Sequence, residues 1–563
     1  MSKKLSLCLA AVLLAGSLLT PTARAQVVDQ DKGSDPKVDY EALKRIGPWD
    51  DRNYSLDAED LEVLAANEAD QRPLVPAFYR VELRKRYPDM PKTGEHQYPR
   101  STLPRFLVEY GGLLIDGQLY RSAHRTDDGY VVDTETPWMS RQEWQEKQLS
   151  GEVRLGPGAE TAVAINPVDP DKVIAGSNGP GGQVMYYSDD GGETWSSTGA
   201  LPNSCCDPTV AWSTDGTRAY AVTLGANNDV YLSTNNGQTW TLLDVVGTGF
   251  VDKEYLHVDG HATSPYKDNL YLTWHLSGNM RFSRSTNLGV SWSPEVSLSS
   301  GGAEEGIGSD ITSDRSGNVY YIWPTFSGGN TWMRKSTDGG ATFEPTRLVL
   351  DTVGSYDFPI PAMDNRLAFM YVSADTDLTN GPYADTIYVA QTDNTGPDSG
   401  NPNSNHARIR VAYSRNGGDT WSVSTPHETA DSDTVDRFHP WLKVGPDGKV
   451  WVVFYDTRNS PDRQDVDFYY SVSDDGAQTW SAPERLTTVS SPEPNDSFEW
   501  GDYNGMDLVM DQLIGIYTDN RNEGGGSGDS IDVYVVGTLT STSEIFRDGF
   551  EAGSTSAWDG SSP

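Results

Sequence analysis

Hydrophobic and polar residues alternate with a period of two along many short runs of the chain. Examples are VMYYS at residues 184–188, DVYLS at 229–233 and RVAYS at 410–414. This period is typical of β-strands that bury one face of a sheet. Each run ends in a short polar stretch that is followed by another strand-like run. The pattern therefore predicts antiparallel hairpins in an all-β protein.

The polar stretch after these runs recurs six times with the same spacing, and this repetition points to a repeat architecture. Its copies are SDDGGETW (188–195), STNNGQTW (233–240), STNLGVSW (285–292), STDGGATF (336–343), SRNGGDTW (414–421) and SDDGAQTW (473–480). We expect Ser188 and Asp190 to hydrogen-bond the turn backbone, Gly192 to adopt positive φ, and Trp195 to pack into the sheet. Ala477 replaces this glycine in the sixth copy, which predicts a strained or differently shaped turn there.

Two further apolar runs precede every copy, so each repeating unit has four strands, as in the blade of a β-propeller. Three strand-like runs without a fourth follow the sixth copy, and residues 142–156 resemble the missing one. We predict a seven-bladed propeller closed by this N-terminal outer strand, with six blades as the alternative. In the fifth blade we expect the second strand at 367–373 and a long polar loop at 375–406.

The turn motif Ser-x-Asp-x-Gly-x-Thr-Trp resembles the Asp-box, or BNR repeat, of the sialidase superfamily, over residues 142–539. The resemblance implies a propeller. For true sialidases it also implies three arginines on the sugar carboxylate, a Tyr–Glu nucleophile pair and an Asp acid. The chain departs from that family pattern because it contains no Arg-Ile-Pro motif, and the nearest string, FPIP at 358–361, lacks the arginine. We therefore expect a divergent member.

The start of the chain predicts export. Lys3 and Lys4, an apolar run and an Ala-Arg-Ala site form a signal peptide at 1–25. An N-terminal extension of unassigned role (26–140), the propeller (141–540) and a flexible polar tail (541–563) follow. No later run approaches the ~18 apolar residues of a membrane-spanning helix. We expect a secreted monomer, extracellular or periplasmic.

The net charge limits the possible partners, and the cysteine content limits the possible disulfides. The net charge of −38 becomes −41 once Lys3, Lys4 and Arg24 leave with the signal peptide. Such a surface repels phosphate, which excludes nucleic acid as a partner. The mature chain keeps only Cys205 and Cys206, which form either a vicinal disulfide or two buried thiols.

The propeller fold also predicts where a ligand binds. The Asp-box turns lie on one face, whereas the segments that lead into the first strands lie on the opposite face, around the channel. These segments are NSCCDP (203–208), VDKEY (251–255), GSYDFP (354–359), DTVDRFHP (433–440) and SFEWGDYNG (497–505).

Asp-x-Arg-Asn occurs twice at the ends of neighbouring second strands, as Asp456 with Arg458 and Asp519 with Arg521. Together with Arg437, three arginines are placed to grip a sugar carboxylate. Alternatively, each Asp-x-Arg is a salt bridge within one blade. We group His439 with these residues as substrate-binding.

Sialidase-type hydrolysis needs a tyrosine activated by a carboxylate, and an acid. Tyr503 or Tyr517 with Glu499 is the candidate pair, and Asp436 is the candidate acid. The alternative is that the tyrosines pack inside the blades and the acids cap loops.

We expect no cofactor. His257, His261 and His275 lie too far apart along the predicted strands for one zinc centre. Structural calcium on acidic loops such as 431–433 is the metal that the sequence favours, and oxygen-rich loops without metal are the alternative.

Three functions stay open. The first is a secreted sialidase-like glycoside hydrolase whose partner is an acidic, carboxylate-bearing extracellular glycan. The second is a non-catalytic glycan- or protein-binding propeller, and the third is a polysaccharide lyase with Tyr or His as base. The sequence favours an enzyme but shows no assembled catalytic centre.

Overall fold

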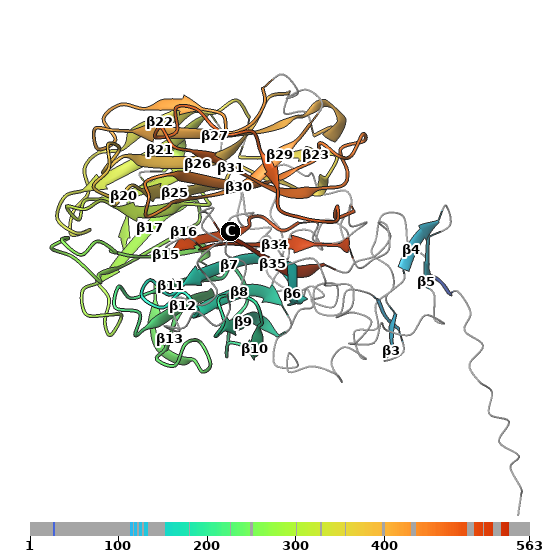
Figure 1. Cartoon of the computed structure of the whole chain (residues 1–563), viewed down its shortest axis with the longest axis horizontal. Coiled ribbons are helices and arrows are strands. Elements are labelled where there is room, and N and C mark those ends of the chain that lie inside the picture. Colours follow the sequence, from blue (N-terminus) through green and yellow to red (C-terminus); the bar gives the residue numbers. More distant parts are fainter. Residues whose placement is uncertain are drawn as a thin grey trace, which may run out of the picture.

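The computed structural model describes residues 26–28, 113–115, 118–120, 123–126, 129–132 and 152–539. The last range has gaps at 180, 226, 248–250, 300, 327–328, 355, 397–399, 430–434, 493–499, 510–511 and 522–530. The body of the molecule is a β-propeller of seven four-stranded antiparallel sheets (Figure 1). The predicted all-β, seven-bladed fold is therefore confirmed.

The first four blades follow one another without interruption. Blade one contains β7 (Ala159–Ile165), β8 (Val173–Gly179), β9 (Gly182–Ser188) and β10 (Ser196–Ala200), and blade two contains β11 (Thr209–Trp212), β12 (Ala219–Leu224), β13 (Asn228–Ser233) and β14 (Thr241–Val246). Blade three contains β15 (Asp252–Val258), β16 (Leu270–Leu276), β17 (Asn279–Ser285) and β18 (Val296–Ser297). Blade four contains β19 (Asp310–Ser313), β20 (Val319–Pro324), β21 (Asn330–Ser336) and β22 (Arg347–Asp351).

The last three blades follow a two-stranded hairpin of β23 (Asp357–Ile360) and β24 (Met363–Phe369). Blade five contains β25 (Val372–Thr376), β26 (Ile387–Asn394), β27 (Ala407–Ser414) and β28 (Ser422–Ser424). Blade six contains β29 (Arg437–Val444), β30 (Val450–Asp456), β31 (Asp467–Ser473) and β32 (Glu484–Arg485). Blade seven contains β33 (Gly505–Val509), β34 (Gln512–Asp519) and β35 (Asp532–Leu539), with β6 (Glu152–Pro157) as its fourth strand. Short 3-10 helices occupy Gly302–Glu304 and Pro402–Ser404.

Strand β6 closes the ring, as predicted. It pairs antiparallel with β35 through Val153 opposite Val535 and Glu152 opposite Val536. The first strands of successive blades contact one another around the axis, and β33 returns to β7. The third strand of blade seven thus gains a partner that covers its outer edge.

Carboxylates on the first strands join neighbouring blades. The Asp310 carboxylate of blade four accepts the N–H of Ala374 in blade five at 2.7 Å. Asp375 then accepts the N–H of Val444 in blade six, and Asp507 of blade seven accepts that of Ile165 in blade one. These aspartates serve the fold, because their oxygens satisfy first-strand amides that have no partner within their own sheet.

The Asp-box turns have the predicted structure. Ser188 Oγ accepts the N–H of Gly192 at 2.9 Å, and Asp190 Oδ1 accepts the N–H of Thr194 at 2.8 Å. Gly192 has a φ of 92°. In the sixth copy Ala477 takes the same position with a φ of 65°, and its N–H still reaches Ser473 Oγ at 2.9 Å. The replacement therefore keeps the turn and places an alanine in a backbone region that disfavours it.

The predicted start of blade five was wrong. The run at 367–373 is divided between β24 and β25, and β25 is the first strand of the blade rather than the second. The interval 375–406 is not one polar loop, because it contains the fully buried strand β26. The hairpin of β23 and β24 buries its hydrophobic residues in an aromatic cluster with residues of blades six and seven. Its sequence therefore has the same hydrophobic pattern as a strand within a blade.

Five short strands precede the propeller. They are β1 (Gln26–Val28), β4 (Ala123–Thr126) and β5 (Gly129–Val132), which form one sheet in the order β1-β5-β4, and the pair β2 (Leu113–Ile115) and β3 (Gln118–Tyr120). The expected signal peptide and C-terminal tail lie outside the described residues. Within the described ranges, no helix has the length and apolar character needed to cross a membrane.

Candidate functional site at the channel mouth

The first strands begin with an unusual backbone in five of the blades. Glu160, Asp207, Lys253, Gly308 and His439 occupy equivalent positions, and all have a φ between 48° and 63°. Bulges interrupt the strand pairing at Glu160, Lys253 and His439. A left-handed residue with a side chain costs about 1–2 kcal/mol, and bulges turn side chains in a new direction. Repeated strain of this kind at one end of a channel marks a candidate site.

A narrow pocket lies where these segments meet. Its wall is built from Lys253, Tyr255, Ser309, Phe369, Tyr371, Val372, His439, Pro440, Trp441, Asp502 and Tyr503. Blades three to seven and the β23–β24 hairpin therefore all contribute to it. The ring centroids of Tyr255 and Trp441 are 5.6 Å apart. Aromatic walls with a few polar groups are typical of ligand sites.

Lys253 supplies the cation of this pocket. Its Nζ lies 3.3 Å from the centroid of the Tyr503 ring and 5.9 Å from that of Tyr371, and the residue is 5% exposed. Burial is the larger effect and leaves the pKa of Lys253 below its usual value, although the negative charge of Asp207 acts to raise it. The ammonium group is thus held by aromatic faces and nearby negative charge inside the pocket.

Tyr503 and Asp207 form a tyrosine–carboxylate pair across the ring. The Tyr503 hydroxyl donates to Asp207 Oδ1 at 3.3 Å, and the backbone N–H of Lys253 donates to Asp207 Oδ2 at 3.3 Å. The Asp207 N–H donates to Asn178 Oδ1 at 2.6 Å. Burial, and then the charge of Asp207, raise the pKa of Tyr503 well above its usual value. Tyr503 is therefore a neutral phenol whose hydroxyl donates to the Asp207 carboxylate.

His439 also faces this pocket. Neither ring nitrogen has a hydrogen-bond partner within the part of the chain that the structure describes, although the residue is only 3% exposed. Burial, and then the charge of Arg366, lower the pKa of His439 to about 3. His439 is accordingly a neutral imidazole that can offer one N–H donor and one nitrogen acceptor to a ligand.

The β23–β24 hairpin reaches across the channel mouth. Arg366 of β24 pairs with Asp502 beside β33 at 2.7 Å and with Glu160 of β7. Glu160 in turn accepts a hydrogen bond from Asn178 of β8. All three charged side chains are buried. The hairpin, which enters the chain between blades four and five, is thus fixed to blades seven and one.

The predicted arginines lie in ion pairs of their own. Arg458 pairs with Asp456 at 2.7 Å and covers the ring of Tyr469, and Arg521 pairs with Asp519 at 2.7 Å and covers that of Tyr534. Both Asp-x-Arg sequences therefore form the local salt bridge that was the alternative interpretation. The guanidinium groups lie over rings of the third strands of blades six and seven, and none of these residues belongs to the pocket wall.

The third arginine and the second tyrosine are also bonded to carboxylates. Arg437 is fully buried and pairs with Asp456 at 2.7 Å. Tyr517 donates to Glu152 at 2.6 Å, and Arg521 pairs with the same carboxylate. Neither Arg437 nor Tyr517 belongs to the wall of the pocket.

Asp436 is fully buried and does not belong to the pocket wall. It pairs with Arg463 at 2.7 Å and accepts the N–H of Ala407 at 2.8 Å. Burial raises the pKa of Asp436 to about 6 despite the charge of Arg463. Glu499, the expected partner of Tyr503, lies outside the described residues.

Sequence reasoning thus found two residues of the pocket wall, His439 and Tyr503, and missed several of their neighbours. Asp207 and Lys253 lie in the segments NSCCDP and VDKEY, which the propeller fold had already placed on the ligand face. Glu160 and Arg366 had no such signal, because their roles depend on a hairpin that was taken for part of a blade.

Metal ligands do not cluster in the described ranges, where no group of three or more His, Cys, Asp or Glu residues is arranged to hold a metal ion. The calcium loop considered at 431–433 lies outside the described residues. His257 bonds to Ser313 and His275 to the backbone of Asp252, so these two histidines have separate partners.

A protein-family model described as "Domain of unknown function (DUF8300)" matches residues 39–124, within the N-terminal extension. No curated protein matches the chain. Among solved structures, it is similar to polysaccharide lyase Uly1, with 10% identity over 78% of this chain and 96% of that chain and a TM-score of 0.42. It is also similar to hydrazine synthase of Kuenenia stuttgartiensis (11% identity, 68% and 97% coverage, TM-score 0.42). A third is the α-L-arabinofuranosidase Arb93A of Fusarium graminearum (11%, 60% and 94%, TM-score 0.38). These are distant similarities of fold.

Proposed function

We propose that the protein is a secreted glycoside hydrolase that binds an anionic sugar of an extracellular glycan at the channel mouth. The observation that supports this most is the arrangement around Tyr503. Its hydroxyl is bonded to Asp207, and its ring lies under the Lys253 ammonium group. A tyrosine with a carboxylate partner corresponds to the Tyr–Glu pair that the sialidase resemblance implies, with Asp207 in the place considered for Glu499 and Lys253 as the cation in place of the three arginines.

Binding would use the cation and the rings of the pocket. A sugar carboxylate suits Lys253, and the neutral His439 can donate a hydrogen bond to it. The aromatic residues Tyr371 and Trp441 of the same wall can pack on the apolar face of a sugar ring. The arginines proposed from the sequence, Arg437, Arg458 and Arg521, would then stabilise their blades through ion pairs and would not bind the substrate.

In the hydrolytic step, Tyr503 Oη would bond to the anomeric carbon while its proton moves to Asp207 and the glycosidic C–O bond breaks. The leaving oxygen needs a proton. Asp436 is our proposed donor, because its pKa of about 6 lets it hold one below that pH. It would first have to exchange its bond to Arg463. Water then attacks the anomeric carbon and gives a proton to Asp436, the bond between Tyr503 Oη and the sugar breaks, and Asp207 returns its proton to Tyr503.

Elimination by a polysaccharide lyase is the second candidate, and one observation favours it. Asp502 in the pocket wall is paired with Arg366, and Asp207 beside the pocket is bonded to Tyr503. Elimination suits this arrangement because it needs no free carboxylic acid. Lys253 would neutralise the carboxylate of a uronate. Tyr503 would take the proton from the carbon next to this carboxylate as its own proton passes to Asp207, and the double bond would form as the glycosidic C–O bond breaks. Tyr503 would then protonate the leaving oxygen, and Asp207 would return its proton to Tyr503.

A substrate screen distinguishes these functions. The secreted protein is incubated with sialosides and with uronate polysaccharides, alongside Tyr503→Phe and Asp207→Asn. Hydrolysis releases saturated sugars, whereas elimination leaves a carbon–carbon double bond that absorbs ultraviolet light. We expect each variant to lose at least about 100-fold in turnover. Tyr470→Phe is the matched control, because the Tyr470 hydroxyl bonds to Glu484 on the outer strand.

Two results would reject the catalytic proposal. Turnover that survives Tyr503→Phe would remove the proposed pair from the reaction. Binding without turnover on either substrate class would instead support the non-catalytic glycan-binding propeller.

A further inference from the structure

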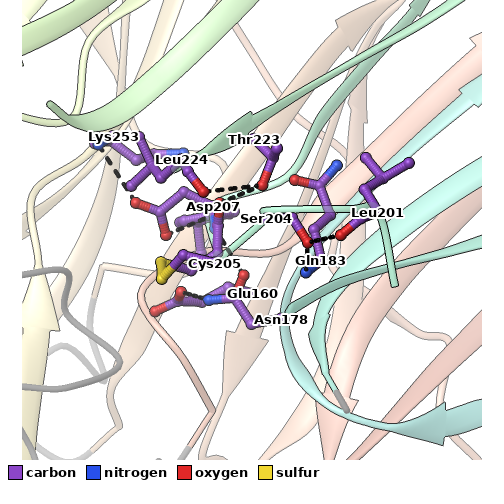
Figure 2. The surroundings of a disulfide bond; sticks show 12 residues. Glu160, Asn178, Gln183, Leu201, Ser204, Cys205, Asp207, Thr223, Leu224 and Lys253 are labelled. Carbon is purple, nitrogen blue, oxygen red and sulfur yellow. Dashed lines mark hydrogen bonds between the residues drawn. A yellow bond between two sulfur atoms is a disulfide. The ribbon is translucent and has the colours of Figure 1, made fainter. Parts of the chain in front are cut away.

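We propose that the vicinal disulfide Cys205–Cys206 positions Asp207, and that its reduction separates Asp207 from Tyr503 and Lys253. The significance for catalysis rests on the proposed function, but the positioning itself does not. The two sulfurs are bonded to each other immediately before Asp207 in the chain. Figure 2 shows the disulfide next to the Asp207 side chain, with a dashed line from Asp207 to Lys253.

Asp207 links blade two to three other blades. It belongs to the segment that leads into blade two, and its carboxylate takes hydrogen bonds from Tyr503 of blade seven and from Lys253 of blade three. Its own N–H is bonded to Asn178 of blade one. A small movement of this one residue would therefore break contacts to three neighbouring sheets.

The backbone of Asp207 needs support to stay in place. Its φ is 56°, in the left-handed region that costs a residue with a side chain about 1–2 kcal/mol. On the N-terminal side, Cys205 donates its N–H to the Leu224 carbonyl at 2.7 Å, and Leu224 donates to the Cys206 carbonyl at 3.1 Å. The eight-membered disulfide ring restricts the torsions between these two anchors. Opening it lets the chain rotate just before Asp207 and lets that residue leave its unfavourable backbone conformation.

The disulfide is accessible from one side. Cys206 is fully buried, whereas Cys205 is half-buried. A dithiol such as dithiothreitol can therefore attack at Cys205. The S–S bond breaks, each cysteine sulfur gains a proton, and the two thiols of the reductant lose theirs as they close into a cyclic disulfide. In an oxidising compartment outside the cell the bond persists. The site would accordingly be assembled only after export.

Hydrogen exchange measured by mass spectrometry tests this on the full-length secreted protein without any substrate. The amide of Lys253 donates to Asp207. We expect it to exchange at least about tenfold faster after reduction, which corresponds to about 1.4 kcal/mol of lost protection. The amide of Gly237 donates to Ser233 Oγ in the Asp-box of the same blade two, and its rate should not change. Alkylation confirms that two thiols have formed.

Two outcomes would overturn the proposal. If the Lys253 rate is unchanged in fully reduced protein, the disulfide does not hold Asp207. If Lys253 of blade three and Gly237 of blade two accelerate together, the disulfide stabilises the blades in general and has no specific role in positioning Asp207. In the variant Asp207→Ala we expect fast exchange at Lys253 with or without reductant. Because none of these readouts needs turnover, failure of the proposed hydrolysis would be recognised separately.

Discussion

The Nζ atom of Lys253 lies 3.3 Å from the centroid of the Tyr503 ring, although the two residues belong to blades three and seven. A buried contact of this kind is worth about 2 kcal/mol. It places a cation on the ring whose hydroxyl is bonded to Asp207. Negative charge that develops on the phenol oxygen, or arrives with a ligand, would meet the same ammonium group.

Replacing Lys253 with Met should therefore weaken binding of anionic sugars selectively. We expect at least a tenfold higher Kd for a uronate oligosaccharide, about 1.4 kcal/mol, and no change for the same oligosaccharide with its carboxyl groups reduced to alcohols. Calorimetric titration of both ligands measures this difference. Lys335→Met is the matched control, because Lys335 also lies over a ring, that of Tyr320, away from the pocket. Equal losses for both ligands would argue against a carboxylate at Lys253.

Arg366→Met should destabilise the fold strongly. The change leaves Glu160 and Asp502 buried without their shared cation. Breaking a buried pair in this way costs about 3–5 kcal/mol, which urea unfolding of both proteins measures. Arg347→Met is the control, since Arg347 pairs with Glu344 and Asp419 at the surface, where such pairs contribute about 1 kcal/mol or less. Similar losses in both variants would show that the hairpin does not depend on Arg366.

The ring closure should be sensitive to acid through Glu152 of β6. Burial acts to raise the pKa of Glu152, but hydrogen bonds and charge from Arg521 outweigh it and lower the pKa to about 2, from 4.5. The ionised carboxylate thus contributes stability that is present above about pH 4.5 and is lost as the pH falls towards 2. The contribution is on the order of 3 kcal/mol. Urea unfolding at pH 7, 4 and 3 should show a shallower acid loss for Glu152→Gln than for the wild type. Parallel profiles would contradict this.

Arg458→Ala separates the two interpretations of the rim. Since Arg458 is bonded to Asp456 and stacked on Tyr469, we expect a lower melting temperature and a Kd for anionic glycans within about twofold of the wild type. Thermal unfolding and calorimetric titration give the two quantities. If Arg458→Ala instead lost binding and kept the wild-type melting temperature, Arg458 would be a ligand of the sugar carboxylate.

The fold was predictable because its signals are local and repeated. Ser188 and Asp190 act within a single turn, and six copies of that turn give the number and order of the strands. The incomplete last unit predicted the pairing of β6 with β35, since an unpaired strand edge has to be covered. The same logic failed where the β23–β24 hairpin presented a strand pattern without being part of a blade.

The site was less predictable because its contacts are long-range. Sequence reasoning placed Tyr503 beside Glu499, its near neighbour in the chain, whereas the structure bonds it to Asp207, 296 residues away. Side-chain direction was the second obstacle. Arg458 and Arg521 follow the second strands of two neighbouring blades, as the sequence predicted, yet the side chains of both extend over tyrosines of the third strands. A one-dimensional pattern assigns residues to a face but does not say which way a long side chain turns.

Closure by β6 also has a consequence for the order in which the chain folds as it is made. Glu152 and Arg521, which bond across the junction, are 369 residues apart. Contacts of such high contact order form late, and here they require β35, which leaves the ribosome after every other strand of the ring. Until then the first strand of the propeller to emerge has no partner. The finished ring is therefore a property of the completed chain, and a product that stops short of β35 would carry an unpaired β6.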